Sequence, residues 1–104
     1  MPVDTDCPAP ELRVLAEPLR WRIVELLAAE ELCVCHLVEM LDTSQSLISH
    51  HLRVLREAGL VETERFRYWT YYRLRPEALA LLAQRLEALA QRASVPGGPR
   101  RACC

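Results

Sequence analysis

Several features are missing from this sequence of 104 residues, and each absence excludes a class of protein. No stretch approaches the roughly 18 consecutive apolar residues that a membrane-spanning helix needs. The first ten residues, MPVDTDCPAP, lack the positive start and the apolar segment of a secretory signal, so we expect a cytoplasmic protein. There is no phosphate-binding loop, no Ser-His-acid arrangement and no recognisable pair of catalytic carboxylates, so we expect no enzyme.

Lysine and asparagine are also absent, so arginine carries all the permanent positive charge of the side chains. The net charge of −1 is unevenly distributed along the chain. Residues 1–42 hold nine acidic residues and three arginines, residues 43–75 hold three and six, and residues 76–104 hold two and four. A polyanionic partner would therefore bind the middle of the chain.

The overall composition is that of one small globular domain, with 51% apolar and 26% charged residues. A chain of this size buries only about two-thirds of its unfolded surface, so a dimer would be a natural source of additional core. We expect a flexible N-terminal arm over residues 1–10, a folded domain over residues 11–93 and a flexible, cysteine-containing tail over residues 94–104.

The hydrophobic periodicity predicts a mainly α fold with one small β-hairpin. Helical spacing predicts a helix that begins at Pro18, a short one over residues 35–41, one that follows the capping residues 42–44 and ends before Gly59, and a last one from Pro76 to about residue 93. Residues 60–74 are rich in β-branched and aromatic side chains, which favours two strands joined by a turn near residues 66–68.

The helix after the capping residues has one apolar and one polar face. We expect His51 on the apolar face, in the core, and the same face is predicted to hold Leu47, Ile48, Leu52, Val54 and Leu55. A helix, a short turn, a second helix and a basic hairpin, in this order, predict a winged helix-turn-helix, whose second helix enters the major groove of double-stranded DNA. The predicted DNA contacts are the polar-face residues Gln45, Ser46, Ser49, His50, Arg53 and Arg56, together with Arg65, Arg67 and, as a further candidate, Tyr68 at the hairpin tip.

Five cysteines are present, an odd number that argues against a closed disulfide framework. Cys33 and Cys35 stand in the run ELCVCHL, directly before the predicted DNA-binding element. Residues two apart point away from each other in the middle of a helix, but at a helix start the first can be non-helical and both sulfurs can converge. The positive end of the helix is expected to lower the thiol pKa, and a thiolate pair suits soft ions such as As(III), Cd(II), Pb(II), Zn(II) or Cu(I).

The run SQSLISHHLRVLREAGLVETERFRYWTYYRL, together with ELCVCHL, resembles the ArsR/SmtB family of metal- and metalloid-responsive repressors over residues 12–92. The resemblance implies a homodimer joined through the first and last helices. This dimer would bind a palindromic operator without a cofactor and would be released by an inducer, for which As(III) is the first candidate. Two positions depart from the family pattern. The wing usually has a glycine where this chain has Phe66 or Arg67, and the helix after the cysteines often begins with Asp where this chain has His36.

Two thiolates are too few for As(III), which takes three ligands, or for Cd(II) and Pb(II), which take three or four. The family's local third cysteine would fall at Val38. The resemblance offers instead Cys7 from the arm of the other subunit, or the adjacent Cys103 and Cys104 of the tail, and His36 is a fourth possibility that would favour Zn(II). Thiol redox sensing without metal and a metal-buffering protein with a vestigial winged helix remain as alternatives.

Overall fold

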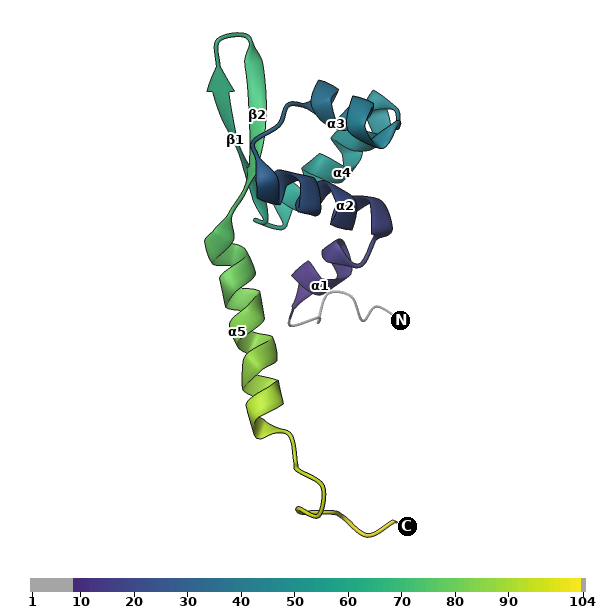
Figure 1. Ribbon diagram of the computed structural model, residues 1–104, viewed down its shortest axis with the longest axis vertical. Helices are drawn as coiled ribbons and strands as arrows, with labels where there is room; N and C mark the ends of the chain where they lie inside the picture. Colours follow the sequence, from purple (N-terminus) through teal and green to yellow (C-terminus); the bar gives the residue numbers. More distant parts are fainter. Residues whose placement is uncertain (1–8, 104) are drawn as a thin grey trace.

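The structure is a computed structural model and describes residues 9–103. Its elements are α1 (Pro10–Leu15), α2 (Pro18–Ala29), α3 (Val34–Leu41), α4 (Gln45–Glu57), β1 (Val61–Phe66), β2 (Trp69–Leu74) and α5 (Pro76–Arg92). Figure 1 shows helices α1 to α4 gathered into one body, with the hairpin projecting beyond it and α5 running away in the opposite direction. The predicted mainly helical fold with one antiparallel hairpin is confirmed.

The turn between α3 and α4 is set by local chemistry. Asp42 ends α3 in the left-handed conformation, with φ of 50°. The Ser44 hydroxyl then accepts a hydrogen bond from the Leu47 backbone amide at 3.2 Å and caps α4, as expected for serine at this position. The helix-turn-helix is tight because Asp42 ends α3 and Ser44, only two residues later, caps the start of α4.

The core lies where α2, α3, α4 and the base of the hairpin meet. Its most deeply buried side chains are Ile23, Leu37, Ile48, Leu52, Leu55, Leu60 and Val61. Burial of each contributes roughly 1.5–3 kcal/mol, so this cluster fixes the orientation of α4 against the rest of the domain. No helix of residues 9–103 is long and apolar enough to cross a membrane.

The hairpin turns over only two residues. Phe66 pairs with Trp69, which leaves Arg67 and Tyr68 as the turn. Arg67 adopts a positive φ of 59°, a conformation that usually favours glycine. The arginine therefore takes the backbone conformation that a glycine of the family pattern would be expected to take at this position. At the other end of β2, Leu32 and Tyr72 exchange two backbone hydrogen bonds of 3.1 and 2.8 Å, which ties the loop before α3 to the hairpin.

The N-terminal part differs from expectation. Helix α1 was not predicted, although Pro10 at its first position and Glu11 in its first turn are typical of a helix start. Helix α3 begins one residue earlier than predicted, and Leu47, which was placed on the apolar face of α4, is exposed. Residues 94–103 contain no helix or strand. The predicted arm of residues 1–10, with Cys7, lies almost wholly outside the described residues, as does Cys104.

His51 is the only buried polar side chain among residues 9–103, with 7% of its surface exposed, as predicted for a core residue. Its Nδ1 lies 2.9 Å from Nη1 of Arg20. Because a guanidinium only donates, this nitrogen must accept, and the ring proton sits on Nε2, which faces Glu17 at 4.0 Å. Burial lowers the pKa of His51, an effect that the Glu17 carboxylate partly opposes.

We therefore expect the protein to lose stability as the pH falls below the pKa of a histidine in an unfolded chain, about 6.5. Below this pH the unfolded chain binds a proton that the folded protein excludes from His51, at a cost of up to about 1.4 kcal/mol per pH unit until the folded pKa is reached. Urea unfolding at about pH 7.5 and about pH 5.5 measures this loss. The variant His51→Gln, whose amide oxygen can still accept from Arg20, should show a smaller loss, and an equal loss would contradict the assignment.

Candidate DNA interface and thiol pocket

The polar face of α4 is exposed to solvent. All six residues predicted on it are exposed, namely Gln45, Ser46, Ser49, His50, Arg53 and Arg56. The opposite face holds Ile48, Leu52 and Leu55 in the core. Helix α4 is therefore anchored along one side and presents donors, acceptors and two guanidinium groups along the other, which is what base and phosphate contacts in a major groove require.

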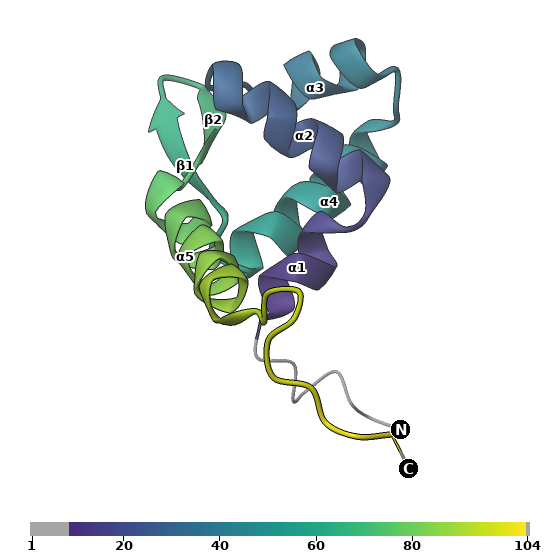
Figure 2. The same cartoon turned by 60° about the horizontal axis from the view of Figure 1, so that its bottom comes forward.

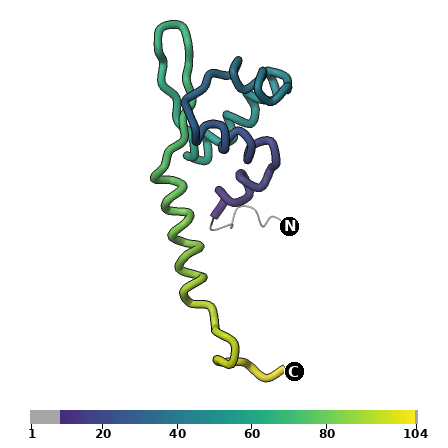
Figure 3. Tube along the Cα trace, viewed as in Figure 1, coloured from purple at the N-terminus to yellow at the C-terminus, as the bar shows by residue number. Residues whose placement is uncertain are grey.

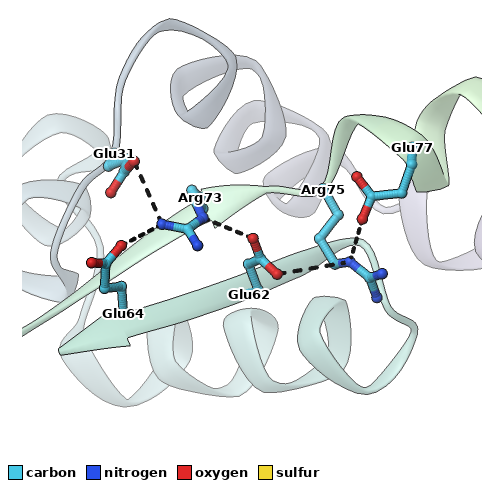
Figure 4. Close-up of polar contacts among 6 residues, drawn as sticks. All are labelled: Glu31, Glu62, Glu64, Arg73, Arg75 and Glu77. Carbon is cyan, nitrogen blue, oxygen red and sulfur yellow. Dashed lines mark hydrogen bonds and ion pairs between the residues drawn. The ribbon is translucent and has the colours of Figure 1, made fainter.

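The arginines of the hairpin divide into two groups. Figure 4 shows Arg73 among the carboxylates of Glu31, Glu62 and Glu64, while Arg75 pairs with Glu62 and Glu77. These carboxylates balance the charge of both arginines, and hydrogen bonds to Glu62 and Glu64 raise the pKa of Arg73. Within residues 9–103, no acidic side chain pairs with Arg65 or Arg67. The free positive charge of the hairpin is therefore at its tip, where it was predicted.

Cys33 and Cys35 line the same open pocket of about 340 Å³. Cys33 is the N-cap of α3, with extended backbone angles of −86° and 167°, whereas Cys35 lies inside the first turn. The non-helical first residue brings both thiols to one site, as predicted. The other lining residues are Val34, Val38, Gln45, Trp69 and Thr70, so the pocket joins the start of α3, the start of α4 and the hairpin.

The protonation of Cys33 differs from expectation. Its side chain is only 5% exposed, and burial raises its pKa, with the nearby Cys35 side chain adding to the shift; a hydrogen bond from Tyr71 opposes it. The prediction of a lowered thiol pKa is therefore wrong for Cys33, because the helix end was considered and the burial was not. At neutral pH this group is a thiol, which must lose its proton when an ion binds.

His36 has a structural role in the same turn. Its Nδ1 accepts the backbone N–H of Cys33 at 3.0 Å, which completes a capping box at the start of α3. In the neutral ring the remaining proton is then on Nε2, so neither nitrogen offers a lone pair to a metal while this bond is intact. The possibility that His36 completes the ion site is not supported by this arrangement.

A third ligand is not found within the described chain. Among residues 9–103, no group of three or more His, Cys, Asp or Glu side chains is placed to hold a metal ion. Cys103 is exposed, and Cys7 and Cys104 lie outside the described residues. The structure thus brings Cys33 and Cys35 to one pocket, and the part of all five cysteines as ion ligands remains a prediction.

Known proteins share both the sequence and the fold. The model of the family described as bacterial regulatory protein, arsR family, matches residues 17–63. The arsenical resistance operon repressor of Escherichia coli K12 is 45% identical over 73 residues, which cover 69% of this chain and 62% of that protein. The matched stretch spans between 46% and 62% of the length of four curated relatives, so the chain corresponds to about half of such proteins.

Two solved structures resemble the fold. A crystal structure of a possible transcriptional regulator for arsenical resistance is 45% identical, with a TM-score of 0.68, and the match covers 75% of this chain and 81% of that one. The homodimeric winged helix-turn-helix domain of a possible ArsR-family regulator from Mycobacterium bovis is 30% identical, with a TM-score of 0.62, and the match covers 76% and 73%. The winged helix-turn-helix prediction is confirmed, and these relatives are regulators and not enzymes.

Proposed function

This chain belongs to the ArsR family of bacterial regulatory proteins, and we propose that it represses transcription as a cytoplasmic homodimer bound to operator DNA until As(III) binds at Cys33 and Cys35. One observation carries the proposal. The pocket that holds both thiols is also lined by Gln45, the first residue of α4, and by Trp69 and Thr70 of the hairpin. An ion held by the two thiols therefore lies in a pocket whose walls include both elements proposed to bind DNA.

The coupling follows from short connections. Cys33 directly follows Leu32, which is hydrogen-bonded to Tyr72 of β2, and the neighbouring Glu31 lies 3.8 Å from Arg73. Ion binding draws the two sulfurs together, and because the loop before α3 is tied to β2, this movement shifts the hairpin relative to α4. The two recognition helices of a dimer must lie about one DNA turn, roughly 34 Å, apart, so a small displacement in each subunit lowers operator affinity.

The third ligand is proposed to come from Cys7 of the partner subunit, with Cys103 and Cys104 of the tail as the alternative. Both are consistent with a pocket that is open on one side. Cd(II), Pb(II) and Zn(II) remain alternative inducers, since they also bind thiolates. Redox sensing through Cys33 is less well supported, because oxidants react with the thiolate and burial keeps this group protonated at neutral pH.

The direct test is fluorescence anisotropy of a labelled DNA fragment from upstream of the protein's own gene. The reduced protein should bind it, and arsenite should release it with a loss of affinity between about 5- and 150-fold. Cadmium, lead, zinc and peroxide are added in separate titrations. Release by cadmium and lead but not by arsenite changes the inducer, release by peroxide alone supports a redox switch, and failure to bind this or any other DNA refutes the repressor.

A second prediction concerns the DNA face itself. If the Arg53 guanidinium contacts a base, replacing Arg53 by alanine should weaken operator binding by about 5- to 100-fold. If it contacts the DNA backbone, the slope of log affinity against log salt concentration should fall by about one, the value for one phosphate contact. Glu57→Ala, one turn further along the same face, is the matched control and should not weaken binding. Equal binding by Arg53→Ala and the native protein at several salt concentrations would place α4 outside the DNA interface.

A further inference from the structure

The tip of the hairpin carries three aromatic side chains that are each more than half exposed. Tyr68 at the apex is 89% exposed, and Phe66 and Trp69, which pair across the turn, are each more than half exposed. Figure 3 shows that this tip is the part of the hairpin farthest from the helical body. Large aromatic groups on a protruding turn contribute nothing to the core, and exposed apolar clusters of this kind mark binding surfaces.

We propose that Tyr68 enters the minor groove of the operator as a wedge and that the bound DNA is bent as a result. This inference rests on the proposed function, since it requires operator binding. Apolar and aromatic wedges that enter the minor groove partly unstack one base step and bend the duplex by about 20–90°. Tyr68 has the position for this, because a two-residue turn places its ring at the extreme end of the hairpin.

The turn is built to hold this arrangement. Arg67 adopts the left-handed conformation that a two-residue hairpin turn needs, and its guanidinium carbon lies 5.5 Å from the centre of the Phe66 ring. This distance is within the range of a cation–π contact, which orients Arg67 beside the apex. Phe66 is therefore a positioning residue for Arg67, which directly precedes Tyr68 in the turn, where a guanidinium can enter the narrow, negative minor groove.

The charges identify DNA as the partner of this surface. Arg65 and Arg67 flank the apex without carboxylate partners among the described residues, whereas Arg73, farther down the hairpin, is neutralised by three glutamates. The tip of the hairpin therefore carries a net positive charge, whereas the positive charge of Arg73 is neutralised. The surface is also continuous with the face of α4, because Trp69 and Thr70 line the same pocket as Gln45. When α4 lies in the major groove, the tip reaches the flanking minor groove.

The experiment measures affinity and bending separately. Anisotropy gives the affinity, and energy transfer between dyes at the two ends of an operator fragment gives the bend. Tyr68→Ala should weaken operator binding about tenfold, within the range expected for loss of one base–aromatic stack, and should remove most of the bend. Tyr68→Phe, which keeps the ring and loses the hydroxyl, should retain both. Arg65→Ala should weaken binding in a salt-dependent way and leave the bend unchanged.

The outcomes separate this inference from the proposed function. If the native protein does not bind the operator, the proposed function fails. If it binds without bending the DNA, or if Tyr68→Ala bends the DNA as the native protein does, only the wedge is refuted. A loss of the bend in Tyr68→Phe, which keeps the ring, would show that the hydroxyl and not the ring bends the DNA, which also overturns the wedge. Thermal unfolding of each variant controls for the fold, which an exposed turn residue should not alter.

Discussion

The variant Cys33→Ser is expected to bind operator DNA within about twofold of the native protein and to resist release by arsenite. In the native protein the inducer should lower affinity between about 5- and 150-fold, which is the usual range of coupling between two sites. A hydroxyl does not replace a thiolate as a soft ligand, so the coupling should disappear. The fold should persist, because Cys33 is the N-cap of α3, where serine is a preferred residue.

Two measurements are needed to interpret this result. Arsenite binding to the DNA-free variant can be measured by competition with a thiol-specific dye. This measurement shows whether the ion site itself is lost. In the native protein, operator DNA should weaken arsenite binding by the same factor as arsenite weakens operator binding, because coupling between binding sites is reciprocal. If Cys33→Ser still leaves DNA on addition of arsenite, Cys33 is not an inducer ligand and the pocket is not the switch.

The source of the third ligand can be tested by complementation. A heterodimer of one Cys7→Ser subunit and one Cys33→Ser subunit retains one complete site only if Cys7 is supplied across the dimer. Arsenite should then bind once per heterodimer and not at all to the Cys7→Ser homodimer. The corresponding pair of Cys33→Ser with a Cys103→Ser, Cys104→Ser double variant tests the tail. Full binding by the Cys7→Ser homodimer would exclude the arm.

The elements that could be predicted from the sequence are those fixed by local signals. Ser44 caps α4, Gly59 with φ of 78° follows its end, and Pro76 opens α5, each as the residue type implies. The exposed face of α4 follows from the helical period alone. Helix α1 was missed because its six residues form only one and a half turns, and what holds it is the packing of Leu15 into the core.

The thiol site could be predicted only in part. The convergence of Cys33 and Cys35 depends on where α3 begins, which is a local property. The burial of Cys33, and with it the raised pKa, depends on the pairing of Leu32 with Tyr72, forty residues along the chain. The same pairing brings Trp69 and Thr70 to the pocket. No periodicity in the sequence indicates that these two hairpin residues belong to the site.

The role of Arg73 could not be predicted either, because it also depends on how the strands pair. The sequence pattern places Arg65 and Arg67 at the hairpin tip as predicted DNA contacts, but it does not reveal which arginine of residues 60–74 a carboxylate neutralises. Only the register of the hairpin places Glu62 opposite Arg73. The charge that faces DNA is thus smaller than a count of arginines suggests, and it is concentrated at the tip of the hairpin and on α4.

Replacing Leu89 by glutamate is expected to dissociate the proposed dimer and to weaken operator binding by more than 100-fold. Leu82, Leu86 and Leu89 form one stripe on α5; the first packs into the core, whereas Leu86 and Leu89 continue beyond it and are exposed. Figure 2 shows α5 nearly end-on, at the edge of the helical body. An apolar stripe that runs past its own core is what a second copy of α5 would cover.

The symmetry of a dimer enlarges the effect. Each substitution occurs twice in a two-fold interface, so two unpaired carboxylates would be buried, at a cost of several kcal/mol for each. A total above about 2.8 kcal/mol raises the dissociation constant more than 100-fold. Because a monomer contacts only one half of a palindromic operator, the loss of dimer carries over to DNA binding.

Sedimentation velocity and operator anisotropy on the same samples measure both effects. Ala80→Glu is the matched control, since it adds the same charge at an exposed position on the opposite side of α5, and it should remain dimeric and bind DNA normally. The circular dichroism spectrum of Leu89→Glu should stay helical, because Leu89 is 59% exposed and outside the core cluster. A dimeric Leu89→Glu that binds its operator would show that the subunits associate through another surface and leave the stripe on α5 without a partner.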